Sequence, residues 1–111
     1  MAFEKVCTLD DVWEGEMEVF SLGDQEVLVI HAEGGQVVAC QAVCPHQDIP
    51  LVEGQLQGGV LTCRAHLWQF DALTGQGINP GGCELALYPV RLDGDDILVD
   101  LADIVPKHVA A

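Results

Sequence analysis

Basic residues are scarce in this chain of 111 residues, which has four Lys and Arg against 18 Asp and Glu. The formal net charge is −14 at pH 7. Such a surface repels phosphate, so nucleic acid is a poor candidate partner, and an anionic membrane is a poor candidate for the same reason. The imbalance instead favours a protein partner with a complementary basic patch, and an encounter that is fast and sensitive to salt.

Long apolar runs and aromatic residues are also lacking. Aromatics make up 5% of the chain, and no apolar run approaches the roughly 20 residues that a membrane-spanning helix needs. The first residues show neither the basic region nor the apolar core of a signal peptide. Half of the residues are apolar and 12 are Gly, which suits a compact β-rich fold. We therefore expect one domain over residues 1–111, a monomer in the cytoplasm.

Short apolar segments separated by Gly-containing turns predict antiparallel strands. The expected strands cover residues 3–7, 17–22, 26–31, 36–42, 60–62, 68–71, 85–92 and 96–101. The strands at 26–31 and 36–42 are apolar enough to be buried on two faces. The expected hairpin turns are Gly23-Asp24, Gly34-Gly35 and Asp93-Gly94.

Two further local features, the segment after Thr8 and the residue His31, allow predictions. Thr8 followed by acidic residues predicts the first turn of a helix, which Trp13 would anchor as a hydrophobic side chain. His31 ends a predicted strand with no Cys or His beside it, so it is interpreted as a surface or structural histidine.

Residues 43–83 differ from the rest because they are rich in Gly, Pro and polar side chains. Residues 78–82 combine one Pro with a Gly pair and are expected to form a loop. The chain therefore predicts an all-β protein, in which an antiparallel β-sandwich base (1–42 and 84–111) carries an inserted subdomain (43–83).

The inserted segment contains two mixed ligand pairs. Cys44-Pro45-His46 is followed, after sixteen residues, by Cys63-Arg64-Ala65-His66. Two thiolates and two imidazoles suit zinc or iron–sulfur chemistry rather than calcium or magnesium. Zinc fingers usually separate the two Cys from the two His. Because each pair here is mixed, the pattern favours a [2Fe–2S] centre with two Cys on one iron and two His on the other.

The sequence motifs around these ligands resemble those of a known family, and the resemblance covers nearly the whole chain. They include Cys44-Pro45-His46-Gln47, Cys63-Arg64-Ala65-His66-Leu67-Trp68, residues 74–80 and the closing Tyr88-Pro89-Val90. With them the chain resembles a Rieske-type ferredoxin, and most closely the ferredoxin component of bacterial toluene/aromatic multicomponent monooxygenases.

The resemblance implies the Rieske fold and one [2Fe–2S] cluster, with Cys44 and Cys63 on one iron and His46 and His66 on the other. It implies a one-electron carrier that is not itself an enzyme. The electron would come from an NAD(P)H-dependent flavin/iron–sulfur reductase and pass to a di-iron aromatic hydroxylase.

The redox potential is expected at the low end of the Rieske class. High-potential members carry an extra Cys in each ligand loop and a Ser and a Tyr that bond the cluster sulfurs, and none of these is evident here. Fewer donors stabilise the reduced cluster less, which places the potential at roughly −150 mV rather than about +300 mV.

Several other residues are candidates for partner docking or electron transfer: Gln47, Arg64, Trp68, Pro80 and the acidic cluster Glu14, Glu16, Glu18. Trp68 could instead pack under the second loop, and Arg64 could instead form a surface salt bridge. The remaining Cys7, Cys40 and Cys83 are interpreted as free thiols in a reducing compartment.

Two alternative functions stay open. The chain could be the Rieske ferredoxin of an aromatic ring-hydroxylating dioxygenase. It could also be a zinc-binding interaction module that uses the same four ligands. Catalysis by the chain alone is not expected, because the ligands fill the metal positions and no nucleophile–base arrangement is evident.

Overall fold

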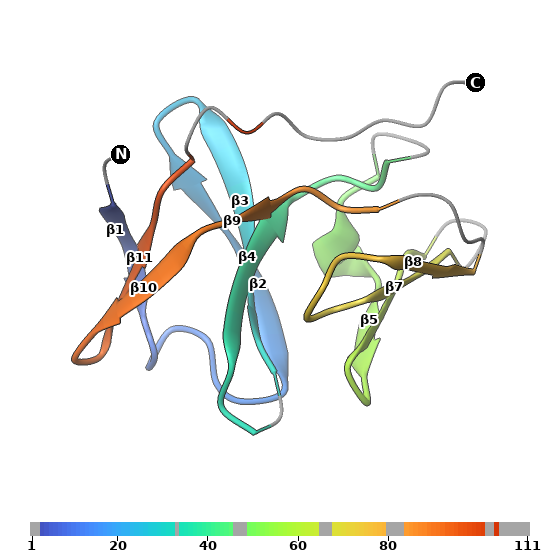
Figure 1. Ribbon diagram of the computed structural model, residues 1–111, viewed down its shortest axis with the longest axis horizontal. Coiled ribbons are helices and arrows are strands. Elements are labelled where there is room, and N and C mark those ends of the chain that lie inside the picture. Colours follow the sequence, from blue (N-terminus) through green and yellow to red (C-terminus); the bar gives the residue numbers. More distant parts are fainter. Residues whose placement is uncertain are drawn as a thin grey trace.

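The computed structural model describes residues 3–32, 34–45, 49–64, 68–79, 84–101 and 104 (Figure 1). Within these ranges one three-residue 3-10 turn, η1 (Leu51–Glu53), accompanies eleven strands. No helix among the described residues is long and apolar enough to cross a membrane. The fold is all-β, as the sequence predicts.

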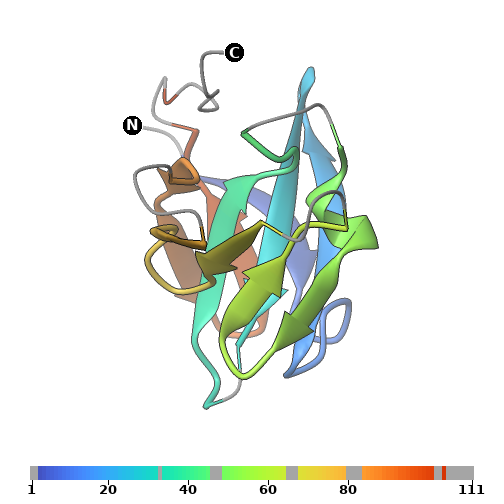
Figure 2. The same ribbon diagram turned by 90° about the vertical axis from the view of Figure 1, so that its right-hand side faces the viewer.

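The strands form three antiparallel sheets, and Figures 1 and 2 show them as successive layers. The first sheet has the order β1-β11-β10, with strands Glu4–Thr8, Asp96–Val99 and Val90–Asp93. The second sheet has the order β2-β3-β4-β9, with strands Glu16–Leu22, Gln25–His31, Val37–Gln41 and Leu87–Tyr88. The third sheet has the order β5-β6-β7-β8, with strands Gln55–Gln57, Val60–Thr62, Gln69–Asp71 and Gly77–Asn79.

The second sheet is the middle layer, and its central strand β3 is buried on both faces. Successive side chains alternate across a strand. Val27 and Val29 therefore join the core shared with the first sheet, whereas Leu28 and Ile30 join the core shared with the third sheet. All four side chains are fully buried, and each contributes about 1.5–3 kcal/mol through removal from water. The expectation of two-sided burial is confirmed.

One predicted strand is divided. Residues 85–92 were expected as a single element, but Tyr88 pairs with Ala39 in the second sheet, whereas Val90 pairs with Val99 in the first. Pro89 lies between them, and a proline has no N–H to donate to a ladder. The chain therefore crosses from one sheet to the other at this residue.

The predicted helix at Thr8 is absent, and a tight turn stands in its place. The Asp11 carboxylate accepts hydrogen bonds from the Thr8 N–H at 2.9 Å and the Thr8 hydroxyl at 3.2 Å, and the Asp11 N–H returns a bond to Thr8 O. Gly15 then adopts φ +86°, a left-handed conformation that ends helical backbone. The capping signal was real, but the segment that follows is too short to propagate a helix.

Trp13 is not the anchor of this turn, because 66% of its side chain is exposed. Its indole N–H donates to Asp10 O at 3.0 Å, which holds the ring over its own turn. The neighbouring Val12 is fully buried and takes the anchoring role. His31 accords with the structural interpretation, because its Nδ1 lies 2.8 Å from Val12 O.

Three other boundaries differ from the prediction. Ile78 and Asn79 belong to β8, which pairs with β7, rather than to a loop. The closing hairpin turns at Gly94-Asp95, since Asp93 pairs with Asp96 and Gly94 has φ +61°. The short strand β5 and the turn η1 were not predicted, because three residues with polar ends give no clear period.

Candidate metal centre

Cys44 lies at the mouth of a short loop that leaves the second sheet after β4. Val43 forms a bridge with Pro50, and the Cys44 N–H donates to Ile49 O at 2.9 Å. These contacts close the backbone on both sides of residues 46–48, which lie outside the described residues. The Cys44 side chain is fully buried.

Cys63 occupies the corresponding place in the third sheet. It follows the last residue of β6, and its N–H donates to Trp68 O at 2.7 Å, just before β7 begins at Gln69. The Cys63 side chain is also fully buried. Each loop thus begins with a buried Cys whose N–H bonds the carbonyl five residues later, which gives the two ligand segments the same closure.

Both thiols belong to one buried cluster, together with Leu51, Leu61 and Phe70. Neither forms a disulfide. Two buried, unbridged thiols at the mouths of matching loops provide the sulfur half of the predicted donor set. This is the donor chemistry that a [2Fe–2S] centre with two Cys ligands requires.

Four predicted site residues fall outside the described residues: His46, Gln47, His66 and Pro80. Cys83 lies outside them as well. The residues that are described contain no group of three His, Cys, Asp or Glu able to hold a metal ion. The assignment of the two imidazole ligands therefore rests on the sequence pattern and stays a prediction.

Arg64 forms an ion pair next to the second ligand. Its Nε lies 2.6 Å from Glu53 Oε1, and both side chains are about half exposed. The pair borders a pocket of about 210 Å³ that Cys63 also lines. The salt-bridge interpretation of Arg64 is therefore confirmed; at this exposure it contributes little stability by itself.

Trp68 is partly buried and packs against the cluster that contains both thiols. This position agrees with packing under the second loop, the structural alternative that the sequence left open. Its role in partner docking stays a prediction.

Two further thiols are buried outside the ligand loops: Cys40 in the same core cluster as Cys44 and Cys63, and Cys7 in the other core cluster. Burial raises the pKa of Cys40 to about 12. Burial, with a smaller contribution from the Asp11 carboxylate, raises the pKa of Cys7 to about 11. Both thiols are therefore protonated and inert near neutral pH.

Sequence reasoning missed two residues that support the first and second loops. Gln41 is fully buried; its Oε1 accepts from the Ala86 N–H at 2.7 Å and its Nε2 donates to Val43 O at 2.9 Å. Gly54 packs so closely that an added Cβ would overlap the carbonyl oxygen of Thr62. A lone Gln inside an apolar strand could have signalled the first; the sequence around Gly54 gives no comparable signal.

Comparison with known proteins decides between the two metals. Residues 2–89 match the family described as the Rieske [2Fe-2S] domain. The chain belongs to the Rieske [2Fe–2S] family. Its cofactor is one [2Fe–2S] cluster, which overturns the zinc alternative, and the buried pair Cys44 and Cys63 fits that cluster.

Curated Rieske relatives match almost the full chain. The alkene monooxygenase system, ferredoxin component, of Xanthobacter autotrophicus (strain ATCC BAA-1158 / Py2) is 47% identical over 104 residues, which cover 93% of this chain and 84% of the relative. The biphenyl 2,3-dioxygenase, ferredoxin component, of Rhodococcus jostii (strain RHA1) is 39% identical over 102 residues, covering 91% and 94%. Both relatives are named ferredoxin components, so this Rieske chain is an electron carrier rather than a catalyst.

A solved structure supports the fold independently. One chain of the complex of reduced oxygenase and oxidized ferredoxin in carbazole 1,9a-dioxygenase has a TM-score of 0.77 and 27% identity to this chain. The match covers 87% of this chain and 91% of that one. The antiparallel three-sheet arrangement is thus the Rieske fold.

Proposed function

We propose that this protein is the ferredoxin component of a multicomponent hydrocarbon monooxygenase. It would take electrons from an NAD(P)H-dependent flavin/iron–sulfur reductase and deliver them to a di-iron hydroxylase. The 47% identity to an alkene monooxygenase ferredoxin over 93% of the chain carries the proposal. The ligand motifs resemble those of toluene monooxygenase ferredoxins, which supports an aromatic substrate. The 47% identical relative is named for alkenes, so the test includes both substrate classes.

In this proposal Cys44 and Cys63 hold one iron, and His46 and His66 hold the other. When bound, the cluster supplies reversible one-electron transfer at a potential set by its ligands and their hydrogen bonds. Both thiols are completely buried, which places the sulfur half of the donor set inside the protein. Residues 43–83 would form the cluster-binding subdomain and residues 1–42 and 84–111 the base.

Docking is proposed to involve the neighbours of the ligands. Gln47, Arg64 and Trp68 lie within two residues of a ligand in the sequence, and Pro80 belongs to the segment 78–82 that the sequence predicts as a loop. The solved complex of the carbazole 1,9a-dioxygenase oxygenase with its ferredoxin supports an oxygenase as one partner. The buried, unpaired thiols Cys7 and Cys40 support a reducing cytoplasm as the compartment.

The dioxygenase alternative is favoured by a separate observation, the 39% identity to a biphenyl dioxygenase ferredoxin. Such an acceptor would carry its own Rieske centre. The two proposals differ only in the acceptor, since the carrier chemistry is shared.

Reconstitution tests the proposal. The purified, iron-loaded protein is combined with a reductase and either a di-iron hydroxylase or a ring-hydroxylating dioxygenase, and product formation from toluene, an alkene and biphenyl is measured. We expect product to form with the di-iron hydroxylase and not with the dioxygenase, and we expect its formation to require the ferredoxin. Turnover only with the dioxygenase would select the alternative, and turnover with neither would refute an oxygenase as the acceptor.

A further inference from the structure

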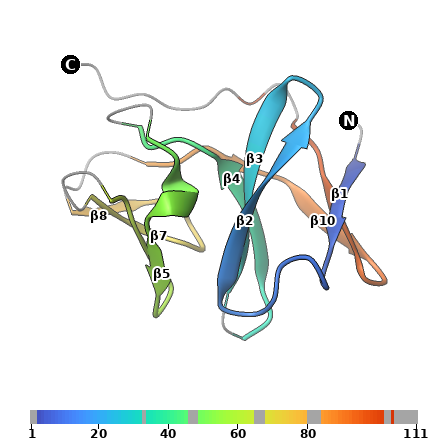
Figure 3. The same ribbon diagram turned by 180° about the vertical axis from the view of Figure 1, so that it is seen from behind.

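A groove of about 410 Å³ lies along the outer edge of β2, and none of the described residues that line it belongs to the ligand segments 44–49 and 63–68. In the order β2-β3-β4-β9, β2 is the edge strand of the second sheet. Seen from behind in Figure 3, β2 lies between β1 and the β5–η1 region. The volume is within the range of roughly 300–1,000 Å³ that is typical of ligand pockets.

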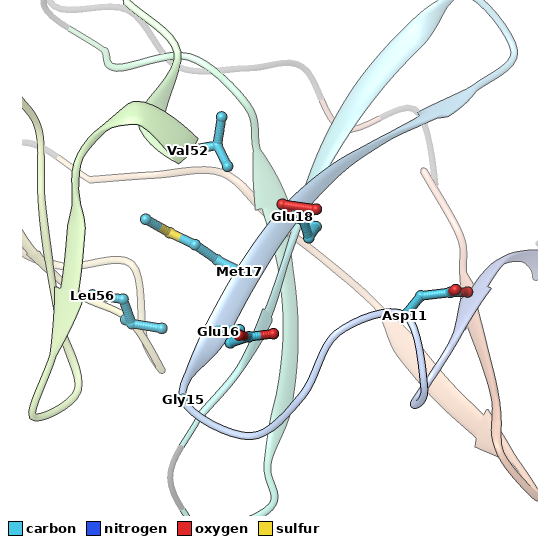
Figure 4. A pocket seen from close by; sticks show the side chains of 7 residues that line it. All are labelled: Asp11, Gly15, Glu16, Met17, Glu18, Val52 and Leu56. Atoms are coloured by element: carbon cyan, nitrogen blue, oxygen red, sulfur yellow. The ribbon is translucent and has the colours of Figure 1, made fainter.

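The two sides of the groove differ in chemistry. Met17 points toward Val52 and Leu56, and these three side chains form an apolar side (Figure 4). Glu16 and Glu18 supply carboxylates to the same groove, whereas the Asp11 carboxylate points away from β2 (Figure 4). None of the described residues that line the groove is basic. The alternation of β2 explains the arrangement, because successive residues of a strand point to opposite faces.

One of the groove carboxylates is held in place by its own turn, because Glu16 accepts from the Trp13 N–H at 3.4 Å. Asp11 instead accepts from the Thr8 N–H at 2.9 Å, on the side away from the groove. A preorganised carboxylate loses less conformational entropy when a cation binds. Glu14, in contrast, bonds the Gly34 N–H at 2.9 Å and does not line the groove. The acidic cluster seen in the sequence therefore divides into a structural Glu14 and a groove pair, Glu16 and Glu18.

The chemistry of the groove selects its occupant. Lys and Arg combine an aliphatic stem with a cationic head, which matches one apolar and one acidic side. A second copy of this chain is disfavoured because each copy carries a net charge of −14. A metal ion is disfavoured because the described residues contain no group of three ligating side chains.

We propose that this groove binds a Lys- or Arg-bearing segment of a protein that exchanges electrons with the ferredoxin. The cationic heads meet Glu16 and Glu18, and the stems lie on Met17, Val52 and Leu56. The inference rests on the proposed function, which gives the chain a reductase and an oxygenase as partners. It adds a contact outside the ligand loops.

Charge reversal and groove filling test different parts of the proposal. Holo-protein with Glu16→Lys and Glu18→Lys should be reduced by the reductase, or oxidised by the oxygenase, about 10-fold more slowly at about 0.1 M salt. The deficit should fall below about 2-fold near 1 M salt, where the screening length is about 3 Å. Leu56→Trp leaves the charge unchanged and fills the groove, so it should slow the same reaction about 10-fold at either salt concentration.

Matched controls separate the groove from overall charge and bulk. Asp24→Lys with Glu26→Lys makes the same change in charge at the exposed hairpin on the other end of β2. Glu26 faces Ser21, so at about 3.3 Å per strand residue it lies roughly 10 Å along the strand from Glu18, and Asp24 lies farther, in the turn beyond Leu22. Leu92→Trp adds the same bulk at a side chain that is 47% exposed on β10. Both controls should stay within about 2-fold of wild type, and all variants should keep the wild-type visible spectrum and redox potential.

Carbodiimide cross-linking to each partner gives a second readout, and Glu16 or Glu18 should be joined to a partner lysine. The proposed binding groove would be overturned by any one of three results. The charge reversal could slow the reaction no more than its control does, Leu56→Trp could have no effect, or the cross-links could be confined to other carboxylates. A wild-type protein that transfers electrons while these results fail leaves the proposed function standing. A wild-type protein that transfers none overturns both.

Discussion

Replacing Gln41 by Leu should cost about 2–4 kcal/mol of stability. The substitution keeps the side-chain size but removes two hydrogen bonds, from the Ala86 N–H at 2.7 Å and to Val43 O at 2.9 Å. Each buried partner left unsatisfied costs about 1–3 kcal/mol, and burial of the Leu methyl groups offsets part of the sum. At roughly 4 °C for each kcal/mol in a domain of this size, the melting temperature should fall by about 8–16 °C.

Thermal unfolding of the holo-protein, followed by far-UV circular dichroism and by the visible absorption of the cluster at one scan rate, measures this effect. Gln57→Leu on the exposed face of β5 is the matched control and should stay within about 0.5 kcal/mol of wild type. Both signals should be lost together in Gln41→Leu, since Val43 directly precedes the ligand Cys44. A shift no larger than that of the control would refute the argument that this side chain joins the first loop to residues 84–88.

Three further predictions concern packing, thiols and ligation. Gly54→Ala should destabilise the protein by about 3 kcal/mol, because its Cβ overlaps backbone, whereas Gly59→Ala, with φ +77° and open space, should cost about 1 kcal/mol in the same denaturation assay. Cys40 has its pKa raised to about 12, so the folded state keeps a proton that the unfolded state loses above about pH 9. Cys40 should then lower the stability by about 1.4 kcal/mol per pH unit from pH 9 toward 12, and Cys7, with its pKa raised to about 11, should add a similar slope from pH 9 toward 11. Cys7 and Cys40 should resist iodoacetamide at pH 8 until the protein unfolds. His66→Cys should lower the potential from roughly −150 mV toward the roughly −400 mV of all-Cys ferredoxins; an unchanged value in a redox titration would contradict the ligand assignment.

The buried strands were the most predictable part of the fold. β3 and β4 have short, continuous apolar runs bounded by glycine turns, and their positions and two-sided burial follow from that pattern. The turn at Thr8 was less predictable, because a capping signal describes only the first turn and leaves the continuation undecided. The exposed Trp13 and buried Val12 show the same limit, since apolar character alone does not tell which of two neighbours faces the core.

The candidate site was predictable through spacing, which places Cys44 and Cys63 in equivalent positions of two loops. The spacing could not predict the buried residues that hold these two loops in place. Gln41 acts through bonds to residues that lie up to 45 positions away in sequence, and Gly54 acts through a close approach of β5 and β6. Both depend on tertiary contacts, which no local pattern encodes.

The segment that forms the third layer leaves the second sheet after β4 and returns to it at β9, which is the neighbouring strand. The Gln41 N–H donates to Ala86 O at 3.0 Å, and Ala39 pairs with Tyr88 in the adjacent β4 and β9. A segment whose ends already lie side by side can vary in length at small entropic cost, because closing a loop twice as long costs only about 0.6 kcal/mol more. This junction is therefore a natural graft point, at which evolution or a designer could exchange one redox cassette for another while retaining the two-sheet scaffold.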